Sequence, residues 1–310
     1  MRHVFIVNPA AGKKQAALAL LPAIRAACEQ NGVEYTVRLT QRAGEAQSIA
    51  REECQKGEAV RLYACGGDGT LHETANGAAG FPQAEIAAVP CGSANDYVRT
   101  FGGERAFRDI AALVCGTAVP VDAVVSGGKL SLDIASMGMD AAVAQKMVKY
   151  KNWPLVSGTM AYNLAILDVF FHKIGMDAHI RMETPDGTVE RDGRYFFALA
   201  AVGRYYGGGY CGAPQAMADD GLLDFVLIKA MPRLQVPGFL TRYKAGKHLD
   251  LACCESFRGT RIEVSSARPV TCTMDGECFS APAISFEIRP AAMRFVLPAG
   301  ASDAAFVNKL

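Results

Sequence analysis

The first 120 residues alternate apolar runs with segments of helical periodicity. The apolar run at residues 4–7 predicts a buried strand, residues 59–65 and 86–89 predict two more strands, and residues 33–39 alternate as a further strand would. The segments between them place apolar side chains three or four residues apart, which is typical of helices packed on a sheet. This order of elements predicts a Rossmann-like α/β domain with a mostly parallel sheet.

The pattern changes after Pro120. Short strand-like stretches follow, separated by Gly, Pro and Asp turns, at residues 121–125, 130–135, 179–182, 195–202, 223–228, 261–264, 270–274, 284–288 and 293–297. With one helical insert, residues 142–172, this pattern predicts a mostly antiparallel β-sandwich. We therefore expect two domains, residues 1–120 and 121–297, and a tail, 298–310, that could pack back on the first.

The composition argues against several classes of protein. The 310 residues carry 32 Lys and Arg against 31 Asp and Glu, so no basic excess indicates a nucleic-acid partner. The most apolar long stretch, residues 155–171, contains Asp168, so no membrane span is expected. The ten cysteines form no C-x-x-C pair, which argues against zinc, and the N-terminus does not resemble an export signal. We expect a cytoplasmic protein with reduced thiols that reaches a membrane only at its surface.

The strongest local signal is a glycine-rich loop between a predicted strand and a predicted helix, Gly66-Gly67-Asp68-Gly69-Thr70-Leu71-His72. Glycines allow a tight turn and the close approach of a ligand, and the free amides of a helix start suit phosphate oxygens. Thr70 can cap the helix and bond a phosphate, whereas Asp68 would repel a bare phosphate and so favours a bridging Mg²⁺. His72 is expected to line the same pocket. An ordinary strand–turn–helix connection is the alternative.

Other polar positions follow neighbouring strands and should lie at the same edge of the sheet. They are Asn8, Pro9, Gly12 and Lys13 in one loop, Thr40 after the next strand, and Ser93, Asn95 and Asp96 in a third loop. Taken alone, the first loop is as consistent with a helix cap as with a nucleotide site, and it lacks the spacing of a Walker A motif. Thr40 alone is more often a cap, and a capped helix start is the alternative for the third loop. Convergence with the glycine-rich loop is what favours a nucleotide site.

Acidic residues dominate the candidate chemistry of the second half. Asp275 and Glu277 follow a predicted strand, where a carboxylate can accept the proton of a hydroxyl during phosphoryl transfer. A solvated turn is the alternative. Asp122 lies at the expected domain junction. The loop 217–222 has adjacent acids, a glycine and exposed carbonyls, which suit a hard cation such as Mg²⁺, although a metal-free turn is equally simple.

The ordered set of motifs resembles the catalytic region of the diacylglycerol kinase and sphingosine kinase superfamily. The matching motifs are Asn8-Pro9-x-x-Gly12-Lys13, Gly66-Gly67-Asp68-Gly69-Thr70, Pro90-x-Gly92-Ser93-x-Asn95-Asp96, Gly207-Gly208-Gly209, Pro214-x-Ala216, Asp219-Asp220-Gly221-Leu222-Leu223-Asp224 and Asp275-Gly276-Glu277. The resemblance spans nearly the whole chain and is closest to the soluble bacterial lipid kinases. One departure is Ser93, where the family usually has Thr, and this change keeps the hydroxyl.

The resemblance implies an ATP- and Mg²⁺-dependent kinase that phosphorylates a hydroxyl of diacylglycerol or a related lipid. Glu277 would be the base, Asp275 would orient it or assist the metal, and Asp122 would support the metal–nucleotide or the base. Asp68 would act with the catalytic metal. The implied ligands of a separate structural Mg²⁺ are the Met217 carbonyl, the Asp220 carboxylate and the Leu222 carbonyl.

Two segments suit contact with a membrane surface. Residues 147–172 combine basic and apolar residues with Trp153, although a helix packed on the core is the more common outcome. A second, basic group could attract anionic lipid headgroups, although such a run is more often a solvated face; its members are Arg242, Lys244, Lys247 and His248.

Two other functions stay open at this point. The glycine-rich loop is also consistent with an NAD kinase, and a non-catalytic nucleotide- or lipid-binding regulator is the second alternative. The presence of Asp68, Asn95 and Glu277 argues against the regulator. The sequence identifies neither the acceptor lipid nor the oligomeric state, a homodimer included.

Overall fold

The computed structural model describes residues 1–12, 16–151, 153, 156, 160, 164–165, 168–169, 175–275 and 277–300, without the side chains of residues 140, 144, 145, 147, 148 and 151. The chain divides into two compact units, Met1–Ala123 with Pro290–Leu310, and Val124–Arg289. Two strands, β5 (Thr117–Ser126) and β13 (Glu277–Leu297), contribute residues to both units. Lys13, Gly276 and residues 301–310 of the predicted tail lie outside the described residues.

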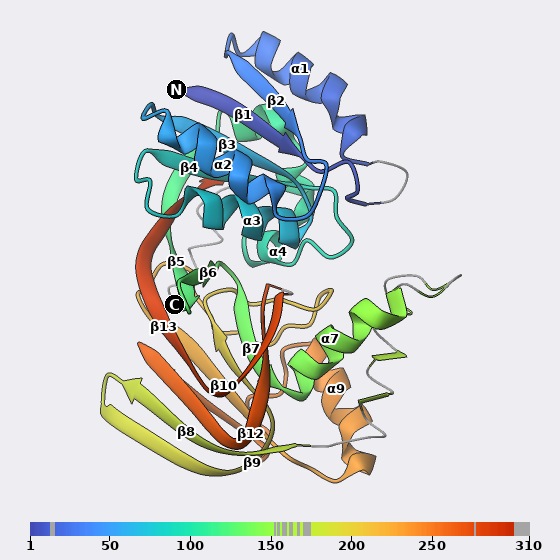
Figure 1. Cartoon of the computed structure of the whole chain (residues 1–310), viewed down its shortest axis with the longest axis vertical. Coiled ribbons are helices and arrows are strands. Elements are labelled where there is room, and N and C mark those ends of the chain that lie inside the picture. The colour runs from blue at the N-terminus through green and yellow to red at the C-terminus, as the bar shows by residue number, and fades with distance from the viewer. Residues whose placement is uncertain are drawn as a thin grey trace. The chain divides into compact units, whose positions relative to one another are not determined.

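The first unit is built on a parallel sheet (Figure 1). Its strands are β1 (Arg2–Val7), β2 (Tyr35–Leu39), β3 (Val60–Gly66) and β4 (Ala84–Pro90), in the order β4-β3-β1-β2. All of these neighbours pair in parallel, and the far end of β13 adds a parallel partner to β4. Every residue of β3 and β4 is buried, which explains why their sequences are mostly apolar without alternation. The charged exceptions, Arg61 and Glu85, form a buried ion pair at 2.8 Å.

Helices connect these strands. They are the 3₁₀ turn η1 (Leu18–Leu20) and the α-helices α1 (Leu21–Gln30), α2 (Glu45–Gln55), α3 (Asp68–Ala78), α4 (Tyr97–Thr100), α5 (Glu104–Phe107) and α6 (Ile110–Val114). Helix α1 packs against α6, and α2 packs against α3. The core contains a stacked pair, Phe5 and Tyr63, with ring centroids 4.0 Å apart. Phe295 of β13 packs against Tyr97 and Phe101, so the last part of β13 contributes to the core of the first unit.

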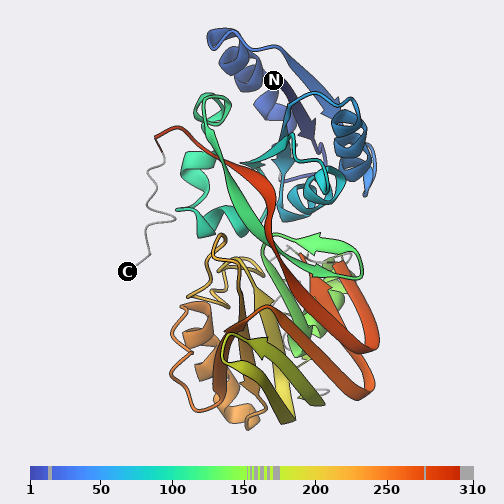
Figure 2. The same cartoon turned by 90° about the vertical axis from the view of Figure 1, so that its left-hand side faces the viewer.

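The second unit is rich in strands (Figure 2). They are β6 (Lys129–Ser131), β7 (Ile134–Gly138), β8 (Met176–Thr184), β9 (Gly187–Ala201), β10 (Leu223–Lys229), β11 (Cys254–Gly259) and β12 (Arg261–Met274), together with parts of β5 and β13. Strands β7, β9, β10 and β11 are antiparallel neighbours in that order, and β12 is antiparallel to β7, β8 and β13. The predicted strands 261–264 and 270–274 are one strand, β12, whose register shifts between Ser265 and Val270.

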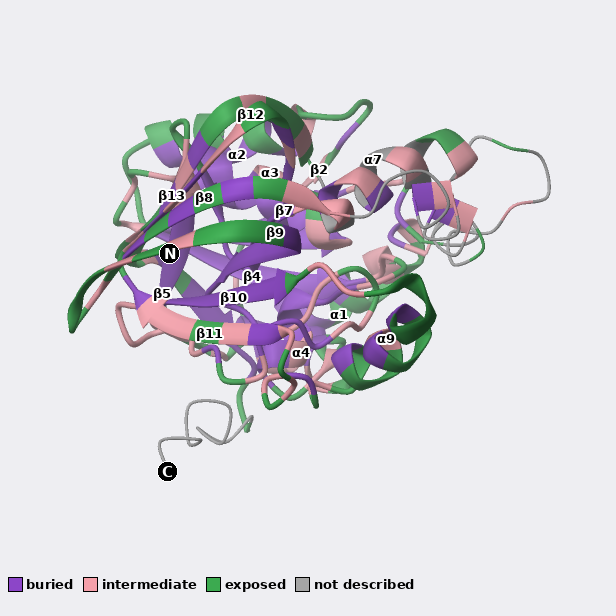
Figure 3. Cartoon of the chain, turned by 90° about the horizontal axis from the view of Figure 1, so that it is seen from below, coloured by how far each residue is buried: buried purple, intermediate pink, exposed green. Residues whose placement is uncertain are grey.

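Both faces of the central strands in the second unit are covered. One core includes Met137, Phe225 and Phe286, and a second core on the opposite face includes Phe197 and Val226. The second core is closed by α9 (Val236–Lys244), which follows the short turn η2 (Arg233–Gln235). Figure 3 shows α9 with one buried side and one exposed side.

Helix α7 (Met139–Lys151) contacts β7, β9 and β12 and forms the first part of the predicted helical insert. Much of the remainder, up to residue 174, lies outside the described residues. Among the residues that the structure describes, no helix combines the length and the hydrophobicity that a membrane span requires.

Candidate active site

The loops that follow β1, β3 and β4 meet at one edge of the parallel sheet. Val7 lies opposite Cys65, and Gly66 lies opposite Pro90, so the three strands end at the same level. The amides of Cys91 and Gly92 donate to the Gly66 carbonyl over 2.9 and 3.1 Å. The side-chain amide of Asn8 donates to the Thr70 hydroxyl over 3.1 Å, which connects the first loop to the glycine-rich loop.

Glycine is required in these loops because their backbones pack directly on one another. A Cβ on Gly66 would lie 2.1 Å from the Thr70 hydroxyl oxygen, and one on Gly92 would lie 2.4 Å from Cα of Gly67. Gly12 has φ +74°, and its Cβ would lie 2.2 Å from the Cys91 carbonyl oxygen. These distances are far below ordinary contact, so the glycines fix how closely the loops approach, besides giving a ligand access.

Helix α3 begins inside the glycine-rich loop, with Gly67 as its N-cap. The amides of Thr70 and Leu71 bond back to the Gly67 carbonyl over 3.0 and 3.1 Å. A Cβ on Gly69 would meet nothing within 4 Å, so the first turn has open space beside it. The start of this eleven-residue helix therefore supplies the positive end of a helix dipole at the edge where the loops meet. Asp68 Oδ1 accepts from the Tyr97 amide over 3.3 Å, which also ties the acid to the third loop.

The third loop is closed by Asn95. This residue is buried with φ 52°, its Oδ1 accepts from the Gly92 amide over 3.1 Å, and its Nδ2 donates to the Gly92 carbonyl over 3.1 Å. Asp96 is buried and lies 3.3 Å from Nε of Arg99, whereas Ser93 is exposed. Asn95 thus shapes the turn, and the Ser93 hydroxyl is the group of this loop that solvent reaches.

The remaining predicted nucleotide residues are placed around this edge. The Thr40 amide donates to the Val7 carbonyl over 2.9 Å at the end of β2, and its side chain is buried. Leu71 and His72 are buried in α3, with His72 Nε2 3.3 Å from Asn76 Nδ2. Pro9 is half-buried in the first loop.

The acids of the second unit lie at the turn between β12 and β13, where Met274 pairs with Glu277. Asp275 has φ 47°, and its Oδ1 accepts from the Ser131 hydroxyl over 2.5 Å. The exposed Glu277 carboxylate forms an ion pair with Lys129 Nζ over 2.5 Å. Strand β6 therefore supplies a partner to each predicted catalytic acid of this unit.

Asp122 has a structural contact within the first unit. It is buried, and its Oδ1 accepts from the Ala291 amide over 2.8 Å. Ala291 has φ 47°, a conformation that is costly for alanine, and this hydrogen bond helps to hold it. The bond connects β5 to β13, while the catalytic support predicted for Asp122 stays a prediction.

In the predicted metal loop, the Asp220 carboxylate is paired with a cationic side chain of the protein, Arg258. Asp220 Oδ1 accepts from the Leu222 amide over 3.0 Å, and Oδ2 is hydrogen-bonded to the Arg258 guanidinium. Arg258 Nε lies 3.7 Å from Asp224 Oδ2, and burial raises the pKa of the Asp224 carboxyl to about 7. A metal at the Met217 and Leu222 carbonyls would have to share Asp220 with Arg258, so this loop fits a metal only if the guanidinium shifts.

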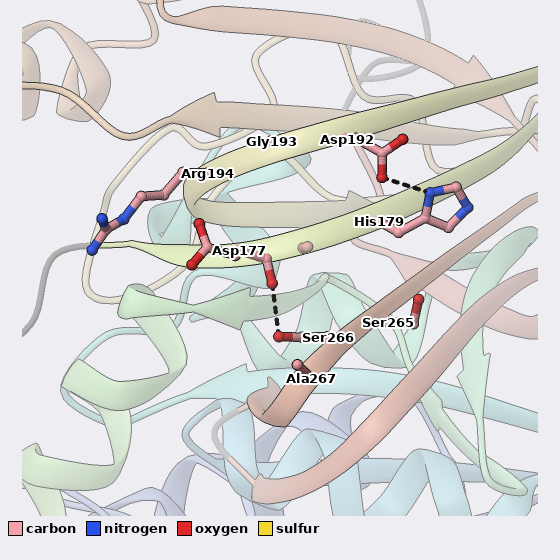
Figure 4. A pocket seen from close by; sticks show the side chains of 9 residues that line it. Asp177, His179, Asp192, Gly193, Arg194, Ser265, Ser266 and Ala267 are labelled. Atoms are coloured by element: carbon pink, nitrogen blue, oxygen red, sulfur yellow. Dashed lines mark hydrogen bonds and ion pairs between the residues drawn. The ribbon is translucent and has the colours of Figure 1, made fainter.

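A separate hollow of about 580 Å³ lies against β8, β9 and β12 of the second unit (Figure 4). In its lining, His179 Nδ1 lies at hydrogen-bond distance, 3.0 Å, from Asp192 Oδ1, and the Ser266 hydroxyl donates to the Asp177 carbonyl over 2.7 Å. None of its lining residues belongs to the predicted site.

Comparison with known proteins decides the family. Residues 2–126 match the diacylglycerol kinase catalytic domain, and residues 133–297 match the YegS C-terminal NAD kinase beta sandwich-like domain. A Pseudomonas aeruginosa (strain UCBPP-PA14) protein named "Probable lipid kinase YegS-like" is 34% identical over 288 residues, which cover 93% of this chain and 92% of that protein. The chain belongs to the diacylglycerol kinase-like superfamily.

Other relatives of this diacylglycerol kinase-like chain agree. A protein of the same name from Pseudomonas savastanoi pv. phaseolicola is 33% identical, over 87% of this chain and 86% of its own length. The crystal structure of a diacylglycerol kinase from Bacillus anthracis str. Sterne has a TM-score of 0.68 at 18% identity and covers 97% of this chain and 98% of that one, so it shares the fold. The family predicted from the motifs is confirmed, as are the two-domain architecture and the strand-rich second part.

Sequence reasoning about this diacylglycerol kinase-like chain missed three partners and misplaced one residue. Lys129, Ser131 and Arg258 were not predicted, although Gly127-Gly128 before Lys129 signals a hairpin that could have drawn attention to it. His248, expected on a basic surface, is fully buried with its ring 4.5 Å from that of Tyr243. Its Nε2 faces the Gly212 carbonyl at 3.2 Å, and burial lowers its pKa to about 4, so it carries no charge for a lipid headgroup.

Proposed function

We propose that the protein is an ATP-dependent lipid kinase that transfers the γ-phosphoryl group to a hydroxyl of diacylglycerol or a related lipid. The observation that supports this most is the junction of the three loops around the start of α3, in a chain of the diacylglycerol kinase-like superfamily. Hydrogen-bond donors at a helix N-terminus beside an acid are suited to a nucleotide that brings Mg²⁺.

ATP would bind with its phosphates toward the first turn of α3. The Thr70 hydroxyl would donate to a phosphate oxygen at the positive end of the α3 dipole, and the exposed Ser93 would make a further contact. Asp68 would hold the Mg²⁺, which would neutralise negative charge on the phosphates. Asn8 and Asn95 would act by fixing the loops, because their side chains already bond Thr70 and Gly92.

The acceptor hydroxyl would be activated by Glu277. Its oxygen attacks the γ-phosphorus as the proton passes to the Glu277 carboxylate, the bond to the β-phosphate oxygen breaks, and ADP leaves. The Ser131 hydroxyl, bonded to Asp275, and the ion pair with Lys129 would position this acidic turn. The products are a lipid phosphate and ADP.

We also propose that the exposed side of α9 contacts anionic membrane surfaces. Arg242, Lys244 and Lys247 are exposed, and Leu234 in the preceding turn η2 is 96% exposed. Basic residues beside a protruding apolar side chain suit an anionic bilayer. Cosedimentation with phosphatidylglycerol vesicles, but not phosphatidylcholine vesicles, is expected for the wild type. Arg242→Glu combined with Lys244→Glu should abolish it, and equal sedimentation with both vesicles would contradict this role.

An NAD kinase is the second candidate, because the second unit matches a domain described as NAD kinase beta sandwich-like. One assay separates the two functions. Purified protein with Mg-ATP is offered diacylglycerol, monoacylglycerol, ceramide, sphingosine and phosphatidylglycerol in mixed micelles, and NAD in a parallel reaction. We expect phosphorylation of at least one lipid and none of NAD. Phosphorylation of NAD alone would establish the second candidate.

A further inference from the structure

Two buried hydroxyls lie side by side in the second unit. Ser136 on β7 pairs directly with Thr273 on β12. Ser136 is fully buried and Thr273 is 6% exposed, and neither hydroxyl has a hydrogen-bond partner in the part of the chain that the structure describes. A buried hydroxyl without a partner costs folding free energy, whereas Ala or Val at either position would not. The stability of the fold therefore gives no reason for two hydroxyls at these positions.

Strand alternation places both hydroxyls in the helix-covered layer. Ala135 and Met137 on β7, and Cys272 and Met274 on β12, belong to the core on the other face. Ser136 shares its face with Ile134, which packs in the cluster closed by α9. Helix α7 contacts both β7 and β12 (Figure 1). The hydroxyls are thus two buried polar groups on the face that carries an apolar core cluster.

This layer continues into the acidic turn. Thr273 precedes Asp275 by two residues, and the Ser131 hydroxyl bonds Asp275. A ligand site built of apolar side chains with a few placed polar groups suits an amphipathic molecule. The polar end of such a molecule would bond the hydroxyls, its apolar chains would enter the helix-covered layer, and its reacting hydroxyl would lie toward Asp275 and Glu277.

We propose that Ser136 and Thr273 donate hydrogen bonds to the ester carbonyl oxygens of a diacylglycerol-like acceptor and so select ester lipids. This inference rests on the proposed lipid kinase function and deepens it. Each hydroxyl would gain in the complex the partner that it lacks in the free protein. Burying the two hydroxyls lowers the stability of the free protein, and in return the site is already formed for selecting its ligand.

The test compares a diacylglycerol with its dialkyl ether analogue, which lacks both carbonyls but keeps the reacting hydroxyl. The wild type should favour the ester by about tenfold in kcat/KM for each hydrogen bond lost in the ether. In Thr273→Val and in Ser136→Ala this preference should shrink about tenfold, mainly through KM for the ester. The lipid-induced rise in Tm, which needs no turnover, should fall in parallel.

Stability separates a ligand role from a structural role. Thr273→Val preserves shape and removes an unpartnered hydroxyl, so its Tm without lipid should equal or exceed that of the wild type. Thr271→Val is the matched control on the same strand, because that hydroxyl already accepts from Ser280 over 3.4 Å. It should leave the ester preference unchanged.

Three results would overturn the inference. The first is an unchanged ester preference in both variants, and the second is a wild type that uses the ether as well as the ester. Each of these would leave the lipid kinase function standing. The third is a wild type that neither phosphorylates nor is stabilised by any lipid, which would remove the proposed function together with this site.

Discussion

The side-chain amide of Asn8 and the hydroxyl of Thr70 lie 3.1 Å apart and join the end of β1 to the first turn of α3. The same hydroxyl oxygen would lie 2.1 Å from a Cβ on Gly66. The position of Thr70 is therefore fixed by a hydrogen bond on one side and by the bare glycine backbone on the other. A nucleotide site that uses Thr70 depends on all three residues together.

Replacing Gly66 with alanine should disrupt this arrangement. The new Cβ would also lie 2.5 Å from Thr70 Cβ, so a rotation of the Thr70 side chain cannot relieve the clash. We expect a loss of stability of about 1–3 kcal/mol and at least a tenfold rise in KM for ATP. Thermal unfolding and ATP saturation curves measure both. Gly238→Ala is the control, because a Cβ there meets nothing within 4 Å. It should leave KM for ATP unchanged and the stability equal to or higher than that of the wild type.

Glu277→Gln should lower kcat about 10²- to 10⁴-fold with little change in KM for ATP, because glutamine keeps the shape but cannot accept the proton. The matched control is Lys129→Met, which removes the ion-pair partner and keeps the carboxylate. It should lose less than about tenfold, since exposed ion pairs contribute little. A Glu277→Gln enzyme with wild-type kcat would show that the base lies elsewhere.

His248 should make the fold sensitive to mild acid. Burial lowers its pKa from 6.5 to about 4, so between these values the unfolded chain binds a proton that the folded chain refuses. The contribution of the neutral imidazole to the free energy of unfolding is complete above pH 6.5 and is lost as the pH falls toward 4, by on the order of 3 kcal/mol. Denaturant unfolding of the wild type and of His248→Phe at several pH values measures it. Parallel pH profiles for the two proteins would exclude the effect.

Arg258 should stabilise the loop that carries Asp220. Its guanidinium bonds Asp220 and lies 3.7 Å from Asp224, so Arg258→Gln should cost about 1–3 kcal/mol. Millimolar Mg²⁺ should restore part of this loss, because the acids and carbonyls of the loop become free to bind a hard cation. The readout is Tm with and without Mg²⁺. If Mg²⁺ instead raises the Tm of the wild type as much as that of the variant, the metal binds despite Arg258.

The buried strands and the glycine-rich loop could be predicted from local sequence patterns. The predicted strand 59–65 corresponds to β3, Val60–Gly66, because a parallel strand with both faces covered is mostly apolar, and its one charged residue, Arg61, is paired with Glu85. Residues 104–114 hold two short helices, α5 and α6. Asp109 separates them, since its side chain accepts from the Ala112 amide over 3.0 Å and begins a new helix.

Contacts distant in sequence could not be predicted in this way. Ser131 and Asp275 are 144 positions apart, and Lys129 and Glu277 are 148 apart, so no local pattern joins them. The burial of His248 likewise depends on a distant contact, because the Gly212 carbonyl that its ring faces is 36 positions away. The proposed polar pair of Ser136 and Thr273 likewise depends on strand register.

The central claim is tested most directly by following the γ-phosphoryl group. Wild-type protein and Glu277→Gln are each incubated with Mg²⁺ and γ-labelled ATP in the presence of a total bacterial lipid extract, and the organic and aqueous phases are separated. The account predicts label in a lipid phosphate from the wild type, with at least a hundredfold less from the variant. Label that stays wholly in the aqueous phase, whether as inorganic phosphate or as a phosphorylated dinucleotide, would contradict it.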